Sequence, residues 1–440
     1  MTVLYDLIFL VFSLAYLPVF IFKRKMHAGF RMRLGALPSA ARFRNPVWIH
    51  AVSVGEAMSV RHLVETLRQR LPGRQFVIST VTPTGNKIAQ SIAVKGDVVI
   101  YLPLDLSWIA RSVVERVDPC LVVLTETEIW PNFITHLSKK NIPIAVVNAR
   151  ISDRSLPGYL LARPLVKPLL NMIGVSCVQS EKDAARLSRL GMAPGKIMVT
   201  GNMKFDIKIK DYDELKKDYT DYRLKLGLGS KERLWIAAST HAGEEEIVLA
   251  AYRGLRAKEA GLKLIIAPRH PERTAAVEEL VNRSPGLTAV RVSQAAKTGT
   301  VNPFQADTSG RQPVFILDTV GQLMYFYTLA DAVFVGGSLV SSGGHNILEP
   351  ASLGRPVVFG RHMFNFRDIA ELFLAHAAAI QVAGQAQLQD AIESLVSDNR
   401  RAAALGKAGR DLIKANQGAT MRNADLISGL LNRKNNGTIR

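Results

Sequence analysis

The chain has 440 residues, 48% of them hydrophobic, so it is neither disordered nor fibrous and is long enough for two domains of roughly 200 residues each. Lys and Arg number 56 against 37 Asp and Glu. The resulting charge of +19 favours an anionic partner: nucleic acid, an anionic membrane surface or a phosphorylated ligand. Cys120 and Cys177, the two cysteines, lie in apolar runs without metal-ligand spacing, which is typical of buried, reduced thiols.

An apolar segment lies at the start of the chain. Val3 to Phe22 contains Asp6 as its only charge and is long enough to cross a bilayer, at about 1.5 Å per residue. A signal peptide would carry positive charge before the apolar run, whereas here the charge follows it. We therefore expect a membrane-anchoring helix over 1–22, with the rest of the chain on the cytoplasmic side. Asp6 and Pro18 leave open whether this helix spans the membrane or lies partly embedded in it.

A basic juxtamembrane segment, 23–46, follows the apolar run and contains no acidic residue. Its basic residues are not set in the pattern of base-stacking aromatics that nucleic-acid-binding modules use. We therefore expect this segment to contact an anionic membrane surface, and we expect no nucleic acid partner. Its seven Lys and Arg are Lys23, Arg24, Lys25, Arg31, Arg33, Arg42 and Arg44.

Short β-branched runs alternate with amphipathic stretches in two parts of the chain. Such alternation is typical of parallel sheets whose strands are joined by right-handed helical crossovers. In 47–206 the expected strands are Val47–His50, Phe76–Thr80, Val98–Tyr101, Leu121–Leu124, Ile144–Asn148, Ser176–Gln179 and Ile197–Thr200, with helices such as Ser107–Val117 and Phe133–Lys139 between them. In 233–432 they are Leu234–Ala238, Leu262–Ala267, Val314–Leu317, Ala332–Val335 and Pro356–Phe359, followed by C-terminal helices.

The predicted fold class is therefore α/β, with two domains of similar size and a ligand cleft between them. The charge-rich residues 207–232 are the expected linker. Asp211-Tyr-Asp213 in this linker resembles the acidic triplet of metal-dependent glycosyltransferases, but its mixed-charge setting is typical of a solvated surface. A surface loop is expected over 296–313 and a frayed tail over 433–440.

A carboxylate follows the first expected strand. Ser53, Gly55 and Glu56 form a turn that leads into a helix with apolar residues at the 3.6-residue period. Because open α/β sheets bind ligands at the carboxyl ends of their strands, Glu56 is a candidate catalytic residue. The local sequence equally allows a second interpretation, in which Glu56 only caps its helix and interacts with the helix dipole.

Other polar residues close strands of the same half. The run Thr125-Glu-Thr-Glu-Ile-Trp-Pro-Asn132 places two carboxylates, Glu126 and Glu128, after a buried strand, and one of them can be structural. Lys204 lies at the expected border between the domains. A lysine at this position would neutralise a phosphate or a sugar carboxylate, or would remain on the surface.

The best candidate for a ligand-binding loop is Gly336-Gly-Ser-Leu-Val-Ser-Ser-Gly-Gly-His-Asn-Ile-Leu-Glu-Pro350. Its glycines would let a phosphate approach the backbone, and free N–H groups at a helix start bind anions. Glu349, one turn on, would accept ribose hydroxyls. The residues expected to line the ligand are Gly337, Ser338, Gly344, His345, Asn346 and Glu349.

Three further loops have the same form of strand, loop and helix. Arg269, after Ala267-Pro268, offers a guanidinium that is always charged. Ser239, Thr240 and His241 would meet a phosphate or cap the helix that follows. Asp318-Thr-Val-Gly-Gln-Leu323 also closes a strand. The G-x-G-x-x-G, P-loop, H-E-x-x-H and paired C-x-x-C patterns are not found, so phosphate binding must use another device.

Seven of these stretches occur together in one order, and in that order they closely resemble the 3-deoxy-D-manno-octulosonic acid (Kdo) transferases of Gram-negative bacteria. The resemblance runs from the apolar N-terminus to the C-terminal helices. The stretches are Ser53-Val-Gly-Glu56, Thr82-Pro-Thr-Gly85, Thr127-Glu-Ile-Trp-Pro-Asn132, Asn148-Ala-Arg150, Lys204-Phe-Asp206, Pro268-Arg-His-Pro-Glu-Arg273 and Gly336-Gly-Ser-Leu-Val…Gly-Gly-His-Asn346.

The resemblance implies a GT-B fold of glycosyltransferase family 30, with two Rossmann-like domains facing each other across a cleft. It implies transfer of Kdo from CMP-Kdo to the lipid A precursor (lipid IVA) in lipopolysaccharide biosynthesis. The reaction would take place at the cell inner membrane, with inversion and without a metal or other cofactor. The matched motifs imply that Glu56 is the general base and that Glu126 and Lys204 support the transition state.

The implied CMP contacts are Pro268, Arg269, Val320, Gly321, Gln322, Asn346, Ile347, Leu348 and Glu349. The loops described above add Ser53, Gly55, Ser239, Thr240, His241, Gly337, Ser338, Gly344 and His345 as further ligand contacts. Two other functions remain open on the sequence alone. One is another GT-B nucleotide-sugar transferase or epimerase, and the other is a membrane scaffold that binds anionic lipid without catalysis.

Overall fold

The chain folds into two compact units. The computed structural model describes residues 2–22, 29–39, 41–207, 228–229, 232–294 and 310–435. Unit 1 comprises Met1–Asp206 and Asn416–Arg440, and unit 2 comprises Ile207–Ala415. The chain therefore leaves unit 1 once and returns to it for its last helix. Most of the predicted linker (207–232), including Asp211-Tyr-Asp213, and most of the predicted loop (296–313) and tail (433–440) lie outside the described residues.

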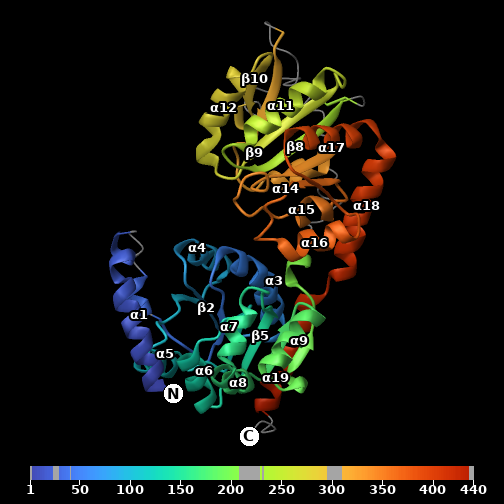
Figure 1. Ribbon diagram of the computed structural model, residues 1–440. Coiled ribbons are helices and arrows are strands. Elements are labelled where there is room, and N and C mark those ends of the chain that lie inside the picture. The colour runs from blue at the N-terminus through green and yellow to red at the C-terminus, as the bar shows by residue number, and fades with distance from the viewer. Residues whose placement is uncertain are drawn as a thin grey trace. The chain divides into compact units, whose positions relative to one another are not determined.

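Unit 1 is built on a seven-stranded sheet whose paired strands run parallel (Figure 1). The strand order is β3-β2-β1-β4-β5-β6-β7, so the winding reverses between β1 and β4. Alternate side chains of a strand enter opposite faces: Trp48 packs in one core cluster, and Val47 and Ile49 pack in the other. The strands are β1 (Val47–His50), β2 (Phe76–Thr80), β3 (Val98–Tyr101), β4 (Leu121–Thr125), β5 (Ile144–Ala149), β6 (Val175–Val178) and β7 (Ile197–Val199).

Helices cover both faces of this sheet. Residues of α3, α4 and α19 share one core cluster, and residues of α5, α6, α8 and α9 share the other. The helices of unit 1 are α1 (Thr2–Phe22), α2 (Phe30–Arg33), α3 (Val54–Arg70), α4 (Pro83–Ile92), α5 (Ser107–Val117), α6 (Pro131–Lys139), α7 (Leu156–Leu161), α8 (Arg163–Met172), α9 (Glu181–Leu190) and α19 (Ala419–Asn435), with 3₁₀ turns η1 (Pro194–Lys196) and η2 (Met203–Phe205).

Unit 2 repeats the plan with a second seven-stranded parallel sheet. Its order is β10-β11-β9-β8-β12-β13-β14, and the winding reverses between β8 and β12. The strands are β8 (Arg233–Thr240), β9 (Leu262–Pro268), β10 (Leu287–Arg291), β11 (Gln312–Ile316), β12 (Ala332–Val335), β13 (Val357–Gly360) and β14 (Ile380–Val382).

One face of the second sheet is covered by α11, α12 and α17, which bury Val248, Val277 and Ile392 against the strands. Elsewhere in the unit, α14 contacts β8 and α15. The helices of unit 2 are α11 (Glu244–Arg256), α12 (Thr274–Arg283), α14 (Leu323–Leu329), α15 (Leu348–Ser352), α16 (Arg367–Ala375), α17 (Gln385–Ser397) and α18 (Asn399–Asn416), with the 3₁₀ turn η3 (Pro271–Arg273).

The two parallel α/β units confirm the predicted α/β class and the two-domain plan, and every predicted strand is present within a few residues of its predicted bounds. The prediction omitted β10 and β14, the two edge strands of the second sheet. The predicted extent of the second domain, 233–432, is wrong at its C-terminal end. The last helix, α19, packs against α3 of unit 1, where Ile427 and Leu431 enter the core.

The first helix, α1, contacts the rest of unit 1 through the side chain of Asp6. Asp6, the only charge of the apolar segment, is 8% exposed, and its Oδ1 accepts hydrogen bonds from Ser107 N at 3.1 Å and Asn132 Nδ2 at 2.7 Å. Phe9 and Leu10 pack against the core of the unit. Within the described residues, no helix combines the length and the hydropathy that a bilayer crossing needs. The membrane anchor and the cytoplasmic location stay predictions.

Candidate active site

Glu56 lies at the reversal point of the first sheet, directly after β1. Ser53 is the N-cap of α3, and its Oγ accepts from Glu56 N. The Glu56 carboxylate is held in return: Oε2 accepts from Val52 N at 2.9 Å and Oε1 accepts from Ser53 Oγ at 2.9 Å. This reciprocal arrangement resembles a capping box, except that the backbone N–H that Glu56 accepts belongs to Val52, one residue before the N-cap, so Glu56 does interact with the start of its own helix. The same hydrogen bonds fix a half-buried carboxylate at the carboxyl edge of the sheet.

The start of α4 packs directly on this turn. Thr82 caps α4, with its Oγ1 accepting from Gly85 N at 3.1 Å, and Thr82 N donates to Val52 O at 3.3 Å. A Cβ at Gly85 would lie 2.8 Å from Thr82 Oγ1 and 3.3 Å from Val52 O. The stretch Thr82–Gly85 therefore brings a second helix start against the turn that carries Glu56.

Glu126 follows β4, the strand beside β1. Its φ of +58° lies in the left-handed region, which costs a non-glycine residue about 1 kcal/mol or more. Its backbone N–H donates to Val147 O at 2.9 Å, and its Oε2 lies 3.5 Å from Arg150 Nε. The strained backbone is held by neighbouring strands, as is typical of functional sites.

Lys204 reaches the same sheet edge from the 3₁₀ turn η2. The turn is fixed from both sides: Met203 N donates to Asn148 Oδ1 at 3.0 Å, and Lys204 N donates to Asn202 Oδ1 at 2.9 Å. Asn148 itself has a φ of +54° at the end of β5. The stretch that begins at Asn148 therefore helps to position the turn that carries Lys204.

Electrostatic contacts join the three predicted catalytic residues. Burial raises the pKa of Glu56, and the neighbouring Glu126 carboxylate raises it further. The hydrogen bonds from Val52 and Ser53 and the charge of Lys204 act in the opposite direction and lower that pKa. The structure therefore brings Glu56, Glu126 and Lys204 into one neighbourhood.

Glu128 is a further ionisable residue of this site that was not among the predicted site residues. Burial, together with the charges of Glu56 and Glu126, raises its pKa to about 7. The sequence signal for this residue was the pair of carboxylates after β4, of which only Glu126 was selected. The site thus contains three carboxyl groups that influence one another.

In unit 2, a buried glutamate organises the glycine loop after β12. Glu244 is 0% exposed and accepts four backbone N–H groups: Gly337 at 2.6 Å, and Ser338, Leu339 and His241 at 2.9 Å each. The loop that sequence predicted to bind a phosphate through its backbone therefore holds the protein's own carboxylate. Gly344 N is also engaged, since it donates to Gly337 O at 2.8 Å.

A second buried glutamate, Glu245, fixes the loop after β8. It accepts two hydrogen bonds from Arg273, at 2.6 and 3.2 Å, and one from Thr240 Oγ1 at 2.9 Å. The hydroxyl of Thr240 is fully buried and serves this internal contact. The Thr240 hydroxyl therefore neither caps α11, whose N-cap Gly243 makes no side-chain hydrogen bond, nor remains free for a phosphate.

Several predicted CMP contacts gather beside this loop. Asn346 Nδ2 donates to Glu349 Oε1 at 3.1 Å, and Asn346 Oδ1 accepts from Leu348 N at 3.1 Å. Burial raises the pKa of Glu349, whereas Asn346 and Arg269 lower it, so Arg269 after β9 lies near Glu349 after β12. Arg269 also lies near His345. The structure therefore joins two of the predicted CMP-binding stretches.

Other predicted contacts have internal roles. Ser338 is fully buried, with its Oγ donating to Val335 O at 2.5 Å and accepting from Gly360 N at 2.8 Å. Ile347 and Leu348 are also 0% exposed, so their side chains belong to the core and only their backbone can face a ligand. Val320 is the opposite case, with 84% exposure in the loop after β11.

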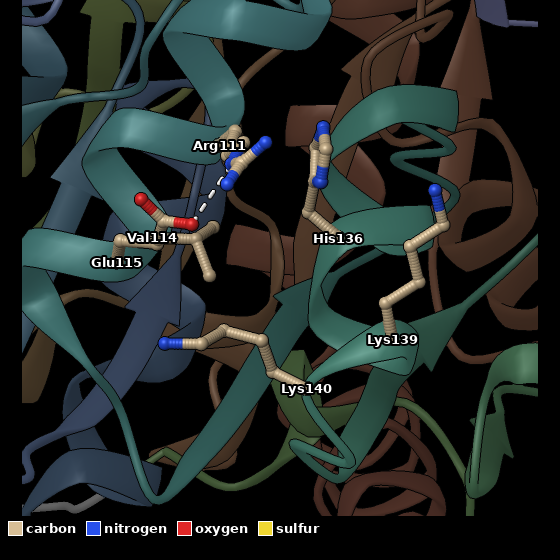
Figure 2. Close-up of a pocket in the computed structure, with 6 residues that line it drawn as sticks. All are labelled: Arg111, Val114, Glu115, His136, Lys139 and Lys140. Atoms are coloured by element: carbon tan, nitrogen blue, oxygen red, sulfur yellow. Dashed lines mark hydrogen bonds and ion pairs between the residues drawn. The ribbon is translucent and has the colours of Figure 1, made fainter.

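A separate basic pocket of about 210 Å³ lies between α5 and α6 (Figure 2). Arg111, His136, Lys139 and Lys140 surround it, and Arg111 is paired with Glu115 at 2.9 Å. The α6 residues belong to the C-terminal half of a helix that begins at the carboxyl edge of the sheet, so the pocket lies toward the opposite edge from Glu56. Over the described ranges, no cluster of three or more His, Cys, Asp or Glu has the arrangement of a metal site.

Comparison with known proteins identifies the family. The family model described as 3-Deoxy-D-manno-octulosonic-acid transferase (kdotransferase) matches residues 28–207. The 3-deoxy-D-manno-octulosonic acid transferase of Haemophilus influenzae is 36% identical over 391 residues, covering 88% of this chain and 87% of that protein. The protein of the same name from Bordetella pertussis is 31% identical over 401 residues, covering 88% and 87%.

Solved structures agree on the fold. The UDP-GlcNAc 2-epimerase of Neisseria meningitidis, bound to UDP-GlcNAc, superposes with a TM-score of 0.58 at 13% identity, over 88% of this chain and all of that one (100%). A glycosyltransferase from Rickettsia africae gives a TM-score of 0.52 at 13% identity, over 88% and 99%. At such identities the likeness shows the fold alone. The sequence matches show more: this chain belongs to the 3-deoxy-D-manno-octulosonic acid transferase family of glycosyltransferases.

Proposed function

We propose that this chain transfers Kdo from CMP-Kdo to a hydroxyl of the lipid A precursor, as a step of lipopolysaccharide biosynthesis at the cytoplasmic face of the inner membrane. The observation that carries the proposal is the grouping of Glu56, Glu126 and Lys204 at the reversal point of the first sheet. Family membership supports the transferred sugar, and the matched stretches of the sequence support the donor and the acceptor.

In the proposed reaction Glu56 is the general base. The acceptor hydroxyl gives its proton to the Glu56 carboxylate while its oxygen forms a bond to the anomeric carbon of Kdo. The bond between that carbon and the phosphate oxygen breaks, and CMP leaves with the electron pair, so the configuration inverts. A raised pKa suits this role, because it makes the carboxylate a stronger base.

The other two residues of the proposed site act on charge. Positive charge develops at the anomeric carbon as CMP departs, and the Glu126 carboxylate would stabilise it. Lys204 would offset the charge of the carboxylates and of an anionic substrate. The CMP group would bind in unit 2 beside Arg269, Asn346 and Glu349. One phosphate needs less charge compensation than a diphosphate, so we expect the reaction to proceed without a metal.

The test uses the full chain with CMP-Kdo and tetra-acylated lipid A precursor. Mass spectrometry should show Kdo added to the lipid, with the same rate in EDTA. Glu56→Ala should lower the rate by at least about 100-fold, because a positioned base contributes roughly that much, and should keep the wild-type melting temperature within a few degrees. Glu115→Ala, at an exposed position of α5, is the matched control and should retain full activity.

Two results would overturn the proposal. One is an absence of Kdo-lipid product from the folded wild-type chain. The other is turnover of a UDP-sugar in place of CMP-Kdo, which would assign the chain to another nucleotide-sugar reaction on the same fold. Full activity of Glu56→Ala would leave the transfer standing and remove Glu56 from the mechanism.

A further inference from the structure

Two imidazoles meet at the reversal point of the second sheet. His241 follows β8 and His345 follows β12, and their Nε2 atoms are 2.8 Å apart. The rings are parallel to within 4°, with centroids 5.1 Å apart. A nitrogen–nitrogen distance this short requires a hydrogen on one Nε2 and a lone pair on the other. The contact therefore persists while at most one of the two rings is charged.

The two imidazoles pack closely against the backbone of Gly337, where there is no room for a side chain. Gly337 has a φ of +66°, and a Cβ there would lie 2.8 Å from His345 Cδ2 and 3.5 Å from His241 Cδ2. The backbone N–H groups beside the pair are already occupied by Glu244. An anion that approaches the reversal point therefore finds imidazoles rather than free loop amides.

The charged groups around the pair leave an excess of positive charge. Glu244 and Glu245 face His241 from α11, but the first is saturated by backbone N–H groups and the second is paired with Arg273. On the other side lie Arg269 and His270, whose ring meets His241 edge-on at 5.8 Å. Among the described residues Arg269 forms no ion pair, so its guanidinium is available to an anionic ligand.

Burial disfavours a positive charge on the pair. It lowers the pKa of His345 to about 4, with smaller lowering by Arg269, His241 and His270. Burial also lowers the pKa of His241, while Glu244 raises it. Because a negative charge nearby favours the protonated ring, an anion bound beside Arg269 would draw a proton onto the pair.

We infer that the His241–His345 pair is a proton-linked clamp for an oxyanion of the donor, which it holds together with Arg269. This inference rests on the proposed function, because the donor is taken to be a nucleoside monophosphate ester of a sugar acid. The oxyanion is then the phosphate or the sugar carboxylate, and both offer the same acceptor chemistry to an imidazolium. Affinity for that anion should fall as pH rises, because the proton it needs becomes scarcer.

Calorimetry of the full chain tests the inference. CMP is titrated at pH 7 in buffers of different ionisation enthalpy, so that the number of protons taken up on binding can be read from the heat. We expect uptake approaching one proton per CMP if the phosphate is held, and uptake with free Kdo instead if the carboxylate is held. Cytidine, which lacks both groups, is the blank.

Two variants assign the proton to the pair. His345→Gln and His241→Gln can still form hydrogen bonds but cannot take up a proton. Each should abolish the uptake and weaken binding of the clamped ligand by about tenfold or more, which corresponds to loss of one charge-assisted hydrogen bond. His376→Gln, at an exposed residue after α16, is the matched control and should match the wild type.

The inference is overturned if wild-type chain binds CMP and Kdo without proton uptake, or if both variants retain the uptake. Melting temperatures of the variants close to that of the wild type separate a lost contact from a lost fold. Failure of the proposed function would give a different result, namely no transfer of Kdo by the wild-type chain. A wild-type chain that transfers Kdo, with uptake unchanged in both variants, refutes the clamp alone.

Discussion

Glu128 couples the candidate site to the stability of unit 1. Its folded-state pKa of about 7 stands above the ordinary value of 4.5. Well below pH 4.5 the carboxyl is protonated in both the folded and the unfolded chain, so it does not lower the free energy of unfolding. As pH rises toward 7 the unfolded chain ionises while the folded chain does not, so stability is lost across this window, by at most about 3 kcal/mol.

Glu128→Gln removes this loss. Its free energy of unfolding, relative to the wild type, should therefore increase progressively between pH 4.5 and pH 7. Urea denaturation at several pH values measures the difference. Glu371→Gln, at an exposed position of α16, is the control and should show a difference that is independent of pH. A pH-independent difference for Glu128→Gln as well would place that carboxyl in water.

At the residue scale, the sequence predicts which side chains matter better than how they are held. Ser53 and Glu56 are visible as a turn and a helix start because their partners are three and four residues away. The role of Glu244 depends on amides 93 to 95 residues further along the chain, so no local pattern indicates it. The left-handed backbone of Glu126 is equally invisible, since glutamate gives no signal for it.

The helix starts of α3 and α4 provide a test at the scale of elements. Each has a glycine in its first turn, Gly55 in α3 and Gly85 in α4. Alanine normally stabilises a helix relative to glycine by up to about 1 kcal/mol. At Gly85 the added Cβ would lie 2.8 Å from Thr82 Oγ1, whereas at Gly55 its nearest neighbour is Ser53 Oγ at 3.9 Å.

Gly85→Ala should therefore lower the free energy of unfolding by about 1 to 3 kcal/mol, the usual cost of overpacking. Gly55→Ala, the matched control, should leave it unchanged or raise it slightly. Thermal and urea unfolding measure both. Equal effects of the two substitutions would show that α4 does not press on the turn of Glu56.

Strands that are buried on both faces were predictable as apolar runs, as in β1, whose four residues are all buried. The edge strand β10 keeps four of its five residues partly exposed, and β14 has three residues, so neither presents such a run. The residue at which α5 starts was predictable, but the group that caps this helix was not. Its N-cap residue, Leu106, makes no capping hydrogen bond, and the cap comes from Asp6, 101 residues earlier.

For the whole molecule, the return of the chain to unit 1 is the feature with the widest effect. Asp206 closes the first pass through the unit, and its carboxylate accepts from Gly418 N at 2.6 Å and Thr420 N at 2.5 Å at the start of α19. Arg422 Nε donates to Thr200 O at 2.8 Å. The two segments of unit 1 are therefore joined by specific hydrogen bonds as well as by apolar packing.

Asp206→Ala should lower the free energy of unfolding of unit 1 by about 1 to 2 kcal/mol, because two N–H groups lose their acceptor. Hydrogen exchange should accelerate in α19 and β6 and stay unchanged in β8 and β12. Asp398→Ala is the matched control in unit 2, where Asp398 accepts from Arg400 N and Arg401 N at the start of α18. Faster exchange throughout unit 2 in Asp206→Ala would contradict this assignment.

The boundary at Asn416 could not be read from the sequence, because an amphipathic helix shows that it has an apolar face but not which sheet it covers. The two-unit plan itself was predictable, since the strand and helix alternation stops at the charge-rich residues near 207–232 and then resumes.

The contact of Asp6 with α5 limits how the chain can be shortened. Leu106 is 5% exposed and packs in the core, so a polar cap cannot replace it without opening that core. The cap must come from elsewhere, and α1 supplies it. A chain that lacks residues 1–22 would lose the Asp6 carboxylate, which accepts hydrogen bonds from Ser107 N and from the side-chain amide of Asn132. Trimming the first helix to improve solubility would therefore also loosen the layer formed by α5 and α6.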